Sequence, residues 1–143
     1  MANILIIDDD EAIRMLLIHQ LQKLGHSVIA AENGFQALHR LTTTSVDLII
    51  TDIFMPEKDG FEFLMEFIRQ PPSGVNPNTI GIIAMTGGSR ILDIPQVLRM
   101  ARRLGAVETI QKPFTMAELQ KKVDLLLALG QPSWANTWEM QLT

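Results

Sequence analysis

The sequence contains no cysteine among its 143 residues, which excludes disulfide bonds and thiolate chemistry. It also has no excess of positive charge. Its 12 basic and 16 acidic residues give a formal charge of −4, which argues against nucleic-acid binding, because that function needs a basic stripe. No apolar run approaches the roughly 20 residues of a membrane span, and the N-terminus lacks the features of a signal peptide. We therefore expect a soluble, cytoplasmic protein without nucleic-acid or membrane partners.

Apolar residues make up 47% of the chain, and its length fits one domain with a sizeable core. Apolar runs alternate with amphipathic segments up to residue 129, so we predict one domain over residues 1–129. Residues 130–143 form a tail of unknown role that carries both tryptophans. Two interpretations of the tail stay open: it docks onto the domain or a partner, or it is a disordered extension.

Five short apolar runs predict strands at residues 3–8, 27–31, 46–52, 79–86 and 107–110. Each run is followed by a segment with apolar residues at helical spacing. Four of these segments begin with capping pairs, at residues 33 and 36, 59 and 62, 93 and 96, and 115 and 118. Five strands that alternate with five helices predict a parallel sheet covered on both faces.

Chemically capable side chains lie at the carboxyl ends of four predicted strands, where ligands bind in such sheets. They are Asp8 to Asp10, Asp52, Thr86 and Lys112. Carboxylates packed together in a cleft repel one another unless a cation lies between them. Because the set contains oxygen donors and neither histidine nor cysteine, it favours Mg²⁺ or Mn²⁺ over zinc.

These side chains also suit phosphoryl transfer. An aspartate can attack phosphorus and form an aspartyl phosphate. The remaining requirements are alignment and stabilisation of charge on the phosphoryl oxygens. A metal ion, Lys112 and the Thr86 hydroxyl supply these requirements once each, all at one edge of the sheet.

Four segments together resemble the signature segments of the response-regulator receiver domains of two-component signalling. They are IIDDDEAIR, DLIITDIFMPEKDG, IIAMTGG and IQKPF. The resemblance covers residues 3 to about 129. It implies a doubly wound α/β fold with a five-stranded parallel sheet in the flavodoxin-like order 2-1-3-4-5 and five helices. It also implies a stand-alone signalling domain, not an enzyme, that catalyses only its own phosphorylation and dephosphorylation.

The resemblance implies a role for each site residue. Asp52 matches the phosphoryl acceptor, and Asp8 and Asp9 match the acid pair that holds magnesium. The backbone carbonyl of Phe54 matches a further metal ligand. Thr86 matches the hydroxyl that follows the phosphoryl group. Lys112 matches the family's lysine, and the resemblance implies a cis bond from it to the following proline.

The implied partners are a histidine kinase or histidine phosphotransfer protein as donor and a protein target as output. The target would contact the face formed by the fourth helix, fifth strand and fifth helix, since the chain leaves no room for an output domain. The sequence departs from the family at Thr109, where an aromatic switch residue is usual, and in a long segment between Thr86 and Lys112 that includes Gly87 and Gly88.

Two alternative functions stay open. Asp8 and Asp10 after an apolar strand resemble the opening motif of haloacid-dehalogenase-type phosphatases, but Ala12 and the lack of a late acidic pair count against that reading. A non-phosphorylated interaction module on a receiver fold is the second alternative. We predict that Asp10 and Glu11 are helix-start acids stabilised by the helix dipole and not ligands.

Overall fold

The computed structural model describes residues 2–55, 57–87, 99, 100, 103 and 108–129. The strands are β1 (Asn3–Ile7), β2 (Ser27–Ala31), β3 (Leu48–Asp52), β4 (Gly81–Thr86) and β5 (Glu108–Gln111). The helices are α1 (Glu11–Lys23), α2 (Gly34–Thr43), α3 (Gly60–Arg69) and α5 (Met116–Leu129), with a 3₁₀ turn, η1, at Pro77–Thr79. All five predicted strands are confirmed, with small shifts at their ends.

The five strands form one parallel sheet in the order β2-β1-β3-β4-β5, as the resemblance implied. The chain reverses its direction of winding between β1 and β3, and open α/β sheets bind ligands outside the carboxyl ends of the strands at such a point. The register pairs Ile7 of β1 with Thr51 of β3. The next residues, Asp8 and Asp52, therefore lie level with each other at the carboxyl edge.

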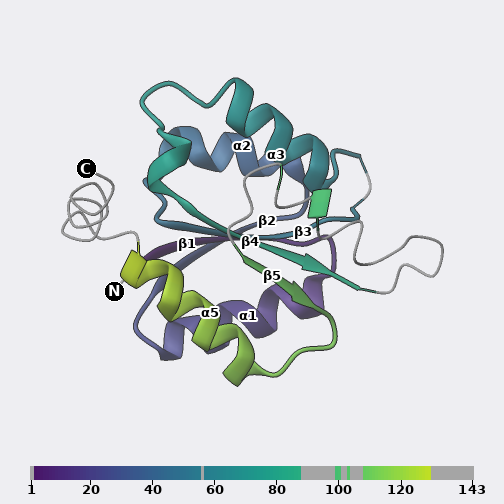
Figure 1. The fold of residues 1–143 in the computed structure, drawn as a ribbon, viewed down its shortest axis with the longest axis vertical. Helices are drawn as coiled ribbons and strands as arrows, with labels where there is room; N and C mark the ends of the chain where they lie inside the picture. Colours follow the sequence, from purple (N-terminus) through teal and green to yellow (C-terminus); the bar gives the residue numbers. More distant parts are fainter. Residues whose placement is uncertain (1, 56, 88–98, 101–102, 104–107, 130–143) are drawn as a thin grey trace.

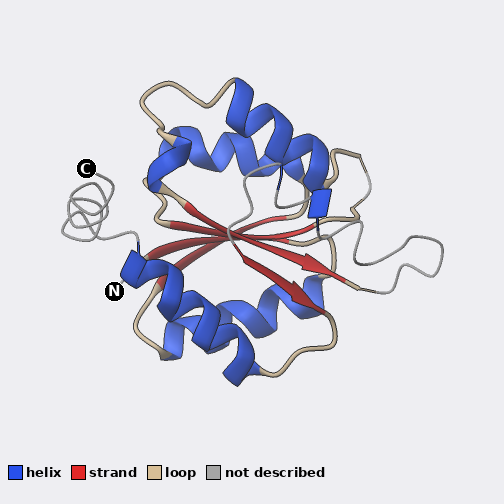
Figure 2. Ribbon diagram, viewed as in Figure 1, coloured by secondary structure: helices blue, strands red, loops and turns tan. Residues whose placement is uncertain are grey.

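Helices cover both faces of the sheet (Figure 1, Figure 2). One face of the sheet packs on α2 and α3. The largest buried side chains in this layer are Phe63 and Phe67, whose stacked rings have centroids 5.7 Å apart. The other face packs on α1 and α5 through Leu17, Leu21 and Val123. With both faces covered, Ile4 to Ile7 of β1 are fully buried, which accounts for the continuous apolar run in the sequence.

Helix starts follow the predicted capping pairs. The side chains of Asn33, Asp59 and Thr115 accept hydrogen bonds from the backbone N–H three residues later, at 2.9, 2.9 and 3.1 Å. The predicted helix that starts near residue 93 lies largely outside the described residues, of which 99, 100 and 103 are helical. The tail, residues 130–143, lies outside them as well. No helix in the described part of the chain is long and apolar enough to cross a bilayer.

Candidate functional site

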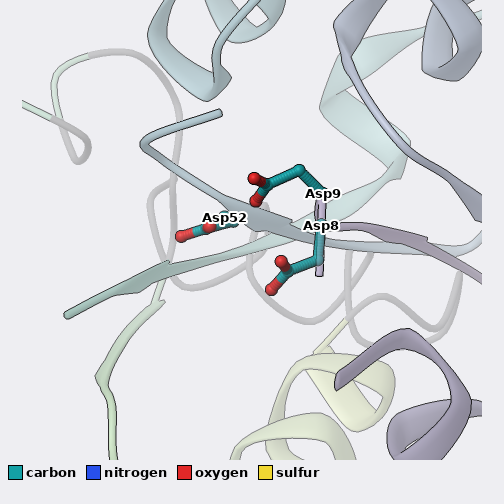
Figure 3. A group of neighbouring side chains, drawn as sticks. All are labelled: Asp8, Asp9 and Asp52. Carbon is teal, nitrogen blue, oxygen red and sulfur yellow. The ribbon is translucent and has the colours of Figure 1, made fainter. Parts of the chain in front are cut away.

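Three carboxylates gather at the carboxyl edge of the sheet (Figure 3). Asp8 and Asp9 follow β1, and Asp52 is the last residue of β3. One oxygen from each lies within 4.8 Å of the others. Asp8 is fully buried and Asp52 is 7% exposed, whereas Asp9 is exposed. The predicted convergence of these acids is confirmed.

Asp10 belongs to the helix and not to the cluster. Its Oδ1 accepts hydrogen bonds from the backbone N–H groups of Ala12 and Ile13, which makes it the N-cap of α1. Its own N–H donates to Oδ1 of Asp8 at 2.9 Å. The prediction that Asp10 is a helix-start acid is therefore confirmed, and it also orients the carboxylate of Asp8.

Lys112 directly follows β5 and contacts the acids of the site. Its Nζ lies 2.8 Å from Oδ2 of Asp8 and 3.5 Å from Oδ2 of Asp52. Its backbone N–H donates to the carbonyl of Thr86 at 2.6 Å, and its bond to Pro113 is cis, as the resemblance implied. Burial alone would lower the pKa of Lys112, but the hydrogen bond to Asp8 and the charge of Asp52 outweigh it and raise the pKa.

Burial raises the pKa of Asp52 to about 6 from an ordinary value of 3.8. The charge of Lys112 opposes this rise, while the negative charges of Asp8 and Asp9 add to it. The backbone N–H of Ile53 donates to Oδ1 of Asp52 at 2.9 Å, which favours the ionised form. Asp52 is therefore a carboxylate that is largely ionised at pH 7 but held at an energetic cost.

Thr86 ends β4 beside this cluster. It is fully buried, and its Oγ1 has no hydrogen-bond partner among the described residues. A buried hydroxyl without a partner is unfavourable and points to a group that is bound in another state. Phe54, whose carbonyl is the remaining predicted ligand, is half-buried, and its ring packs edge-on against Phe61 with centroids 6.2 Å apart.

Two departures from the family pattern are also visible. Thr109 is buried on β5, where a threonine takes the place of the family's usual large ring. Gly87 lies so close to Lys112 that a Cβ atom would be 2.6 Å from Cβ of that lysine. Gly88 and most of the long segment after it lie outside the described residues.

The sequence analysis missed two residues that shape the site. Arg14 donates from Nη1 to the carbonyl of Asp8 at 2.8 Å. Gly60 lets α3 approach β3, because a Cβ atom there would lie 2.2 Å from the carbonyl oxygen of Asp52. The capping pair at residues 59 and 62 predicts a helix start here, but sequence spacing cannot show such an approach. Arg14 carries no signal beyond its place in the first turns of a helix.

The donor set fits a divalent cation. The cluster offers carboxylate oxygens without nitrogen or sulfur donors, which suits magnesium or manganese. Lys112 sets one positive charge against three carboxylates, so it balances only part of their negative charge. A cation among these oxygens would reduce the remaining repulsion.

Comparison with known proteins gives a consistent result. The probable transcriptional regulator ycf27 of Cyanidium caldarium is 37% identical over 125 residues, which are 87% of this chain and 46% of that protein. The chain thus spans about half or less of the length of the first curated relatives it matches. Sporulation initiation phosphotransferase F of Bacillus subtilis is 32% identical over 126 residues, 88% of this chain and 94% of that protein.

Solved structures agree with these relatives. The signal receiver domain of a signal transduction histidine kinase from Syntrophus aciditrophicus superimposes with a TM-score of 0.76 at 32% identity, over 90% of this chain and 91% of that one. Chemotaxis protein CheY4 of Vibrio cholerae gives 0.74 at 29% identity, over 88% and 98%. The family model of the response regulator receiver domain matches residues 4–124 of this chain. The chain belongs to the response regulator receiver domain family.

Proposed function

We propose that Asp52 accepts a phosphoryl group from a histidine kinase or histidine phosphotransfer protein in a Mg²⁺-dependent reaction, and that this step switches protein–protein contacts. The observation that carries the proposal is the setting of Asp52. This ionised carboxylate lies level with Asp8 and faces the Lys112 ammonium. On the neighbouring strand lies the Thr86 hydroxyl, which has no hydrogen-bond partner among the described residues.

The carboxylates of Asp8, Asp9 and Asp52, with the backbone carbonyl of Phe54, would hold Mg²⁺, for which Mn²⁺ could substitute. When bound, the ion supplies positive charge that offsets the carboxylates and the phosphoryl group. Asp8 also holds the Lys112 ammonium in place through a 2.8 Å contact.

In the transfer step, a carboxylate oxygen of Asp52 attacks phosphorus and the phosphorus–nitrogen bond of the donor's phosphohistidine breaks. The electron pair of that bond stays on the imidazole nitrogen, which takes up a proton where the solution supplies one. A pKa of about 6 leaves Asp52 mostly ionised at pH 7, as a nucleophile must be. Lys112 and the Thr86 hydroxyl would bind phosphoryl oxygens and so stabilise their charge; the contact of Lys112 with Asp52 supports this role.

An apolar groove beside the acceptor supports docking of a protein donor. The groove has a volume of about 440 Å³, and its lining includes Ile13 and Leu16 of α1 together with Phe114 and Met116. Lys112, which contacts Asp52, also lines it, so a protein seated there would lie next to the acceptor site. Leu16 is 50% exposed, and a partner that covered it would gain apolar burial.

Phosphorylation adds negative charge beside Lys112 and gives the Thr86 hydroxyl a partner. Movement of Thr86 toward that charge would change β4 and the neighbouring β5, where Thr109 lies opposite Ala84. We propose that the output target binds the face that includes β5 and α5, and that the reaction takes place in the cytoplasm. With Thr109 in place of a ring, this coupling runs through the backbone and the α5 contacts of β5, including Lys122 Nζ to the Thr109 carbonyl at 2.8 Å.

The two alternatives gain no support from the described residues. A haloacid-dehalogenase-type mechanism needs Asp8 as a free nucleophile, yet Asp8 is fully buried and bound to Lys112 and to the N–H of Asp10. Asp10, its supposed acid, caps α1. A module that is never phosphorylated would leave two features without a purpose: the raised pKa of Asp52, and the buried Thr86 hydroxyl, which has no partner in the part of the chain that the structure describes.

The test is phosphoryl labelling from acetyl phosphate with Mg²⁺, compared between the wild-type protein, Asp52→Asn and Asp124→Asn. Asp124 is an exposed acid on α5 and serves as the matched control. We expect acid-stable, base-labile label in the wild type and in Asp124→Asn but not in Asp52→Asn, and none when EDTA replaces Mg²⁺. Label that survives Asp52→Asn would refute the assignment.

A further inference from the structure

The turn that leads from β2 into α2 consists of Glu32 and Asn33 together with Gly34, the first residue of α2. It contributes no oxygen to the cluster of Asp8, Asp9 and Asp52. It nevertheless connects to both segments that carry the predicted ligands. One connection runs to the end of β1, and the other runs to the loop between β3 and α3. We call these residues the β2–α2 turn.

The first connection passes through Arg14 of α1. Its Nη1 donates to the carbonyl of Asp8 at 2.8 Å, and its Nη2 lies 3.7 Å from Oε1 of Glu32. The Arg14 side chain is only 14% exposed. The backbone N–H of Asp8 also donates to the carbonyl of Ala31, the last residue of β2, at 3.2 Å. The peptide group before Asp8 is therefore held by β2, and the one after it is held by Arg14 of α1, which in turn contacts Glu32.

The second connection reaches the loop after Asp52. Nδ2 of Asn33 donates to Oε2 of Glu57 at 2.9 Å, and the N–H of Gly34 donates to the carbonyl of Lys58 at 2.9 Å. Glu57 has a φ of 65°, in the left-handed region that non-glycine residues rarely adopt, so this loop must be held in place by its surroundings. A Cβ atom at Gly34 would lie 2.8 Å from Cγ of Lys58, so a larger residue there would force the Lys58 side chain to move.

Lys58 strengthens the second connection. Its Nζ lies 5.0 Å from the ring centroid of Phe35 on α2 and 2.9 Å from Oε1 of Glu66 on α3. The Lys58 side chain is 12% exposed, so these contacts are partly protected from water. The loop that carries the Phe54 carbonyl is thus fastened to α2 as well as to its own helix.

We propose that the β2–α2 turn sets the separation of the two ligand-bearing segments, with Arg14 and Asn33 as positioning residues for the divalent cation. The inference rests on the proposed magnesium site. A ligand set held in advance binds its ion more tightly than one that must be ordered on binding, and loss of residues that orient ligands typically lowers metal affinity about 10–100-fold.

Charge makes this proposal sharply testable. Arg14 is a cation near a cation site, so its charge alone weakens Mg²⁺ binding. If Arg14 acted only through charge, Arg14→Met would tighten Mg²⁺ binding. If it acts by holding the Asp8 segment, the same substitution weakens binding. The two roles therefore predict changes in Mg²⁺ affinity of opposite sign.

The experiment measures the Mg²⁺ dissociation constant of the full chain by calorimetry, at a temperature well below thermal unfolding. The variants are Arg14→Met, Arg14→Lys and Asn33→Ser. The serine can still cap α2 by accepting from the N–H of Gln36 but cannot reach Glu57, so it separates the connection from the cap. Arg69→Met, at the exposed end of α3, is the control for loss of one positive charge.

We expect Mg²⁺ affinity to fall about 10-fold in Arg14→Met and in Asn33→Ser, and less in Arg14→Lys, because lysine keeps the charge but only one donor position. Arg69→Met is expected to leave the affinity near the wild-type value. If Arg14→Met folds poorly, Asn33→Ser and Arg14→Lys decide the question, provided that their thermal stability equals that of the wild type.

Unchanged or tighter Mg²⁺ binding in Arg14→Met and Asn33→Ser, with a wild type that binds normally, overturns the inference and leaves the proposed function intact. A fall in thermal stability with no fall in Mg²⁺ affinity also overturns it, because the contacts would then serve only the fold. Absence of measurable Mg²⁺ binding by the wild type overturns the proposed function itself.

Discussion

Replacement of Asp52 by asparagine should stabilise the fold at neutral pH when no divalent cation is present. The folded state holds the pKa of Asp52 at about 6, against an ordinary value of 3.8 in an unfolded chain. Below pH 3.8 the carboxyl is protonated in both states and costs nothing. As the pH rises toward 6, the unfolded chain loses its proton first, so stability falls. Above pH 6 the full penalty is present.

Each unit of pKa difference corresponds to about 1.4 kcal/mol, so the ionised Asp52 lowers the free energy of unfolding by about 3 kcal/mol above pH 6. Asparagine removes this penalty and can still accept the Ile53 N–H at Oδ1. Lys112 loses a contact of 3.5 Å but keeps its 2.8 Å contact with Asp8. We therefore expect a gain of about 2–3 kcal/mol at pH 8 and almost none at pH 4.

The assay is urea unfolding in EDTA, followed by circular dichroism from pH 4 to pH 8, for the wild type, Asp52→Asn and the exposed-site control Asp124→Asn. Circular dichroism is preferred because both tryptophans lie in the tail. Mg²⁺ should reduce the difference in stability between the wild type and Asp52→Asn at pH 8, since it binds the folded wild type more tightly than the folded variant. An Asp52→Asn protein that is equal to or less stable than the wild type at pH 8 would show that pairing with Lys112, and not burial, dominates at this position.

Three further substitutions test the surroundings of Asp52. Gly60→Ala places a Cβ atom 2.2 Å from the Asp52 carbonyl, so we expect a loss of about 1–3 kcal/mol in urea unfolding together with slower labelling; unchanged stability would contradict the close approach. Thr86→Val removes a hydroxyl with no described partner, so the melting temperature should stay the same or rise slightly. The structural change on addition of beryllofluoride, which stands in for the phosphoryl group, should be lost. A large drop in melting temperature would indicate a hidden partner. Glu57→Gly should be about 1 kcal/mol more stable than Glu57→Ala, because both lose the hydrogen bond from Asn33 but only glycine adopts a φ of 65° without strain; equal stability of the two variants in thermal melts would remove the argument from strain.

Much of the fold is predictable from the sequence because the signals are local. The run from Ile4 to Ile7 is continuous in apolar residues because both faces of β1 are buried, and Asp59 precedes a helix because its carboxylate caps it. The third strand begins at Leu48 and not at residue 46, a difference that periodicity does not resolve. The fourth begins at Gly81, because the residues just before it form the turn η1.

The acids of the site are also predictable, since parallel strands bring their carboxyl ends to one edge. Arg14 and Asn33 are not, for a physical reason. Asn33 contacts Glu57 in a distant segment of the chain, whereas Arg14 turns back to the nearby Asp8 carbonyl. Both contacts depend on side-chain directions that no spacing rule contains. The exposed N-cap position of Asn33 explains its identity fully at the local level. A second role for the same side chain becomes visible only when the β3–α3 loop lies beside it.

The site combines several unfavourable features at one edge of an otherwise well-packed sheet. Asp52 is ionised at a cost, the Thr86 hydroxyl is buried without a described partner, and Glu57 holds a left-handed backbone. Proteins keep such features where function requires them. A cation would relieve the first, and a phosphoryl oxygen would relieve the second. A phosphoryl group on Asp52 would add negative charge at the cation site, so the two ligands should strengthen each other's binding. Under the proposed function, the cation would therefore act in two ways: it would permit the reaction, and it would stabilise the phosphorylated state.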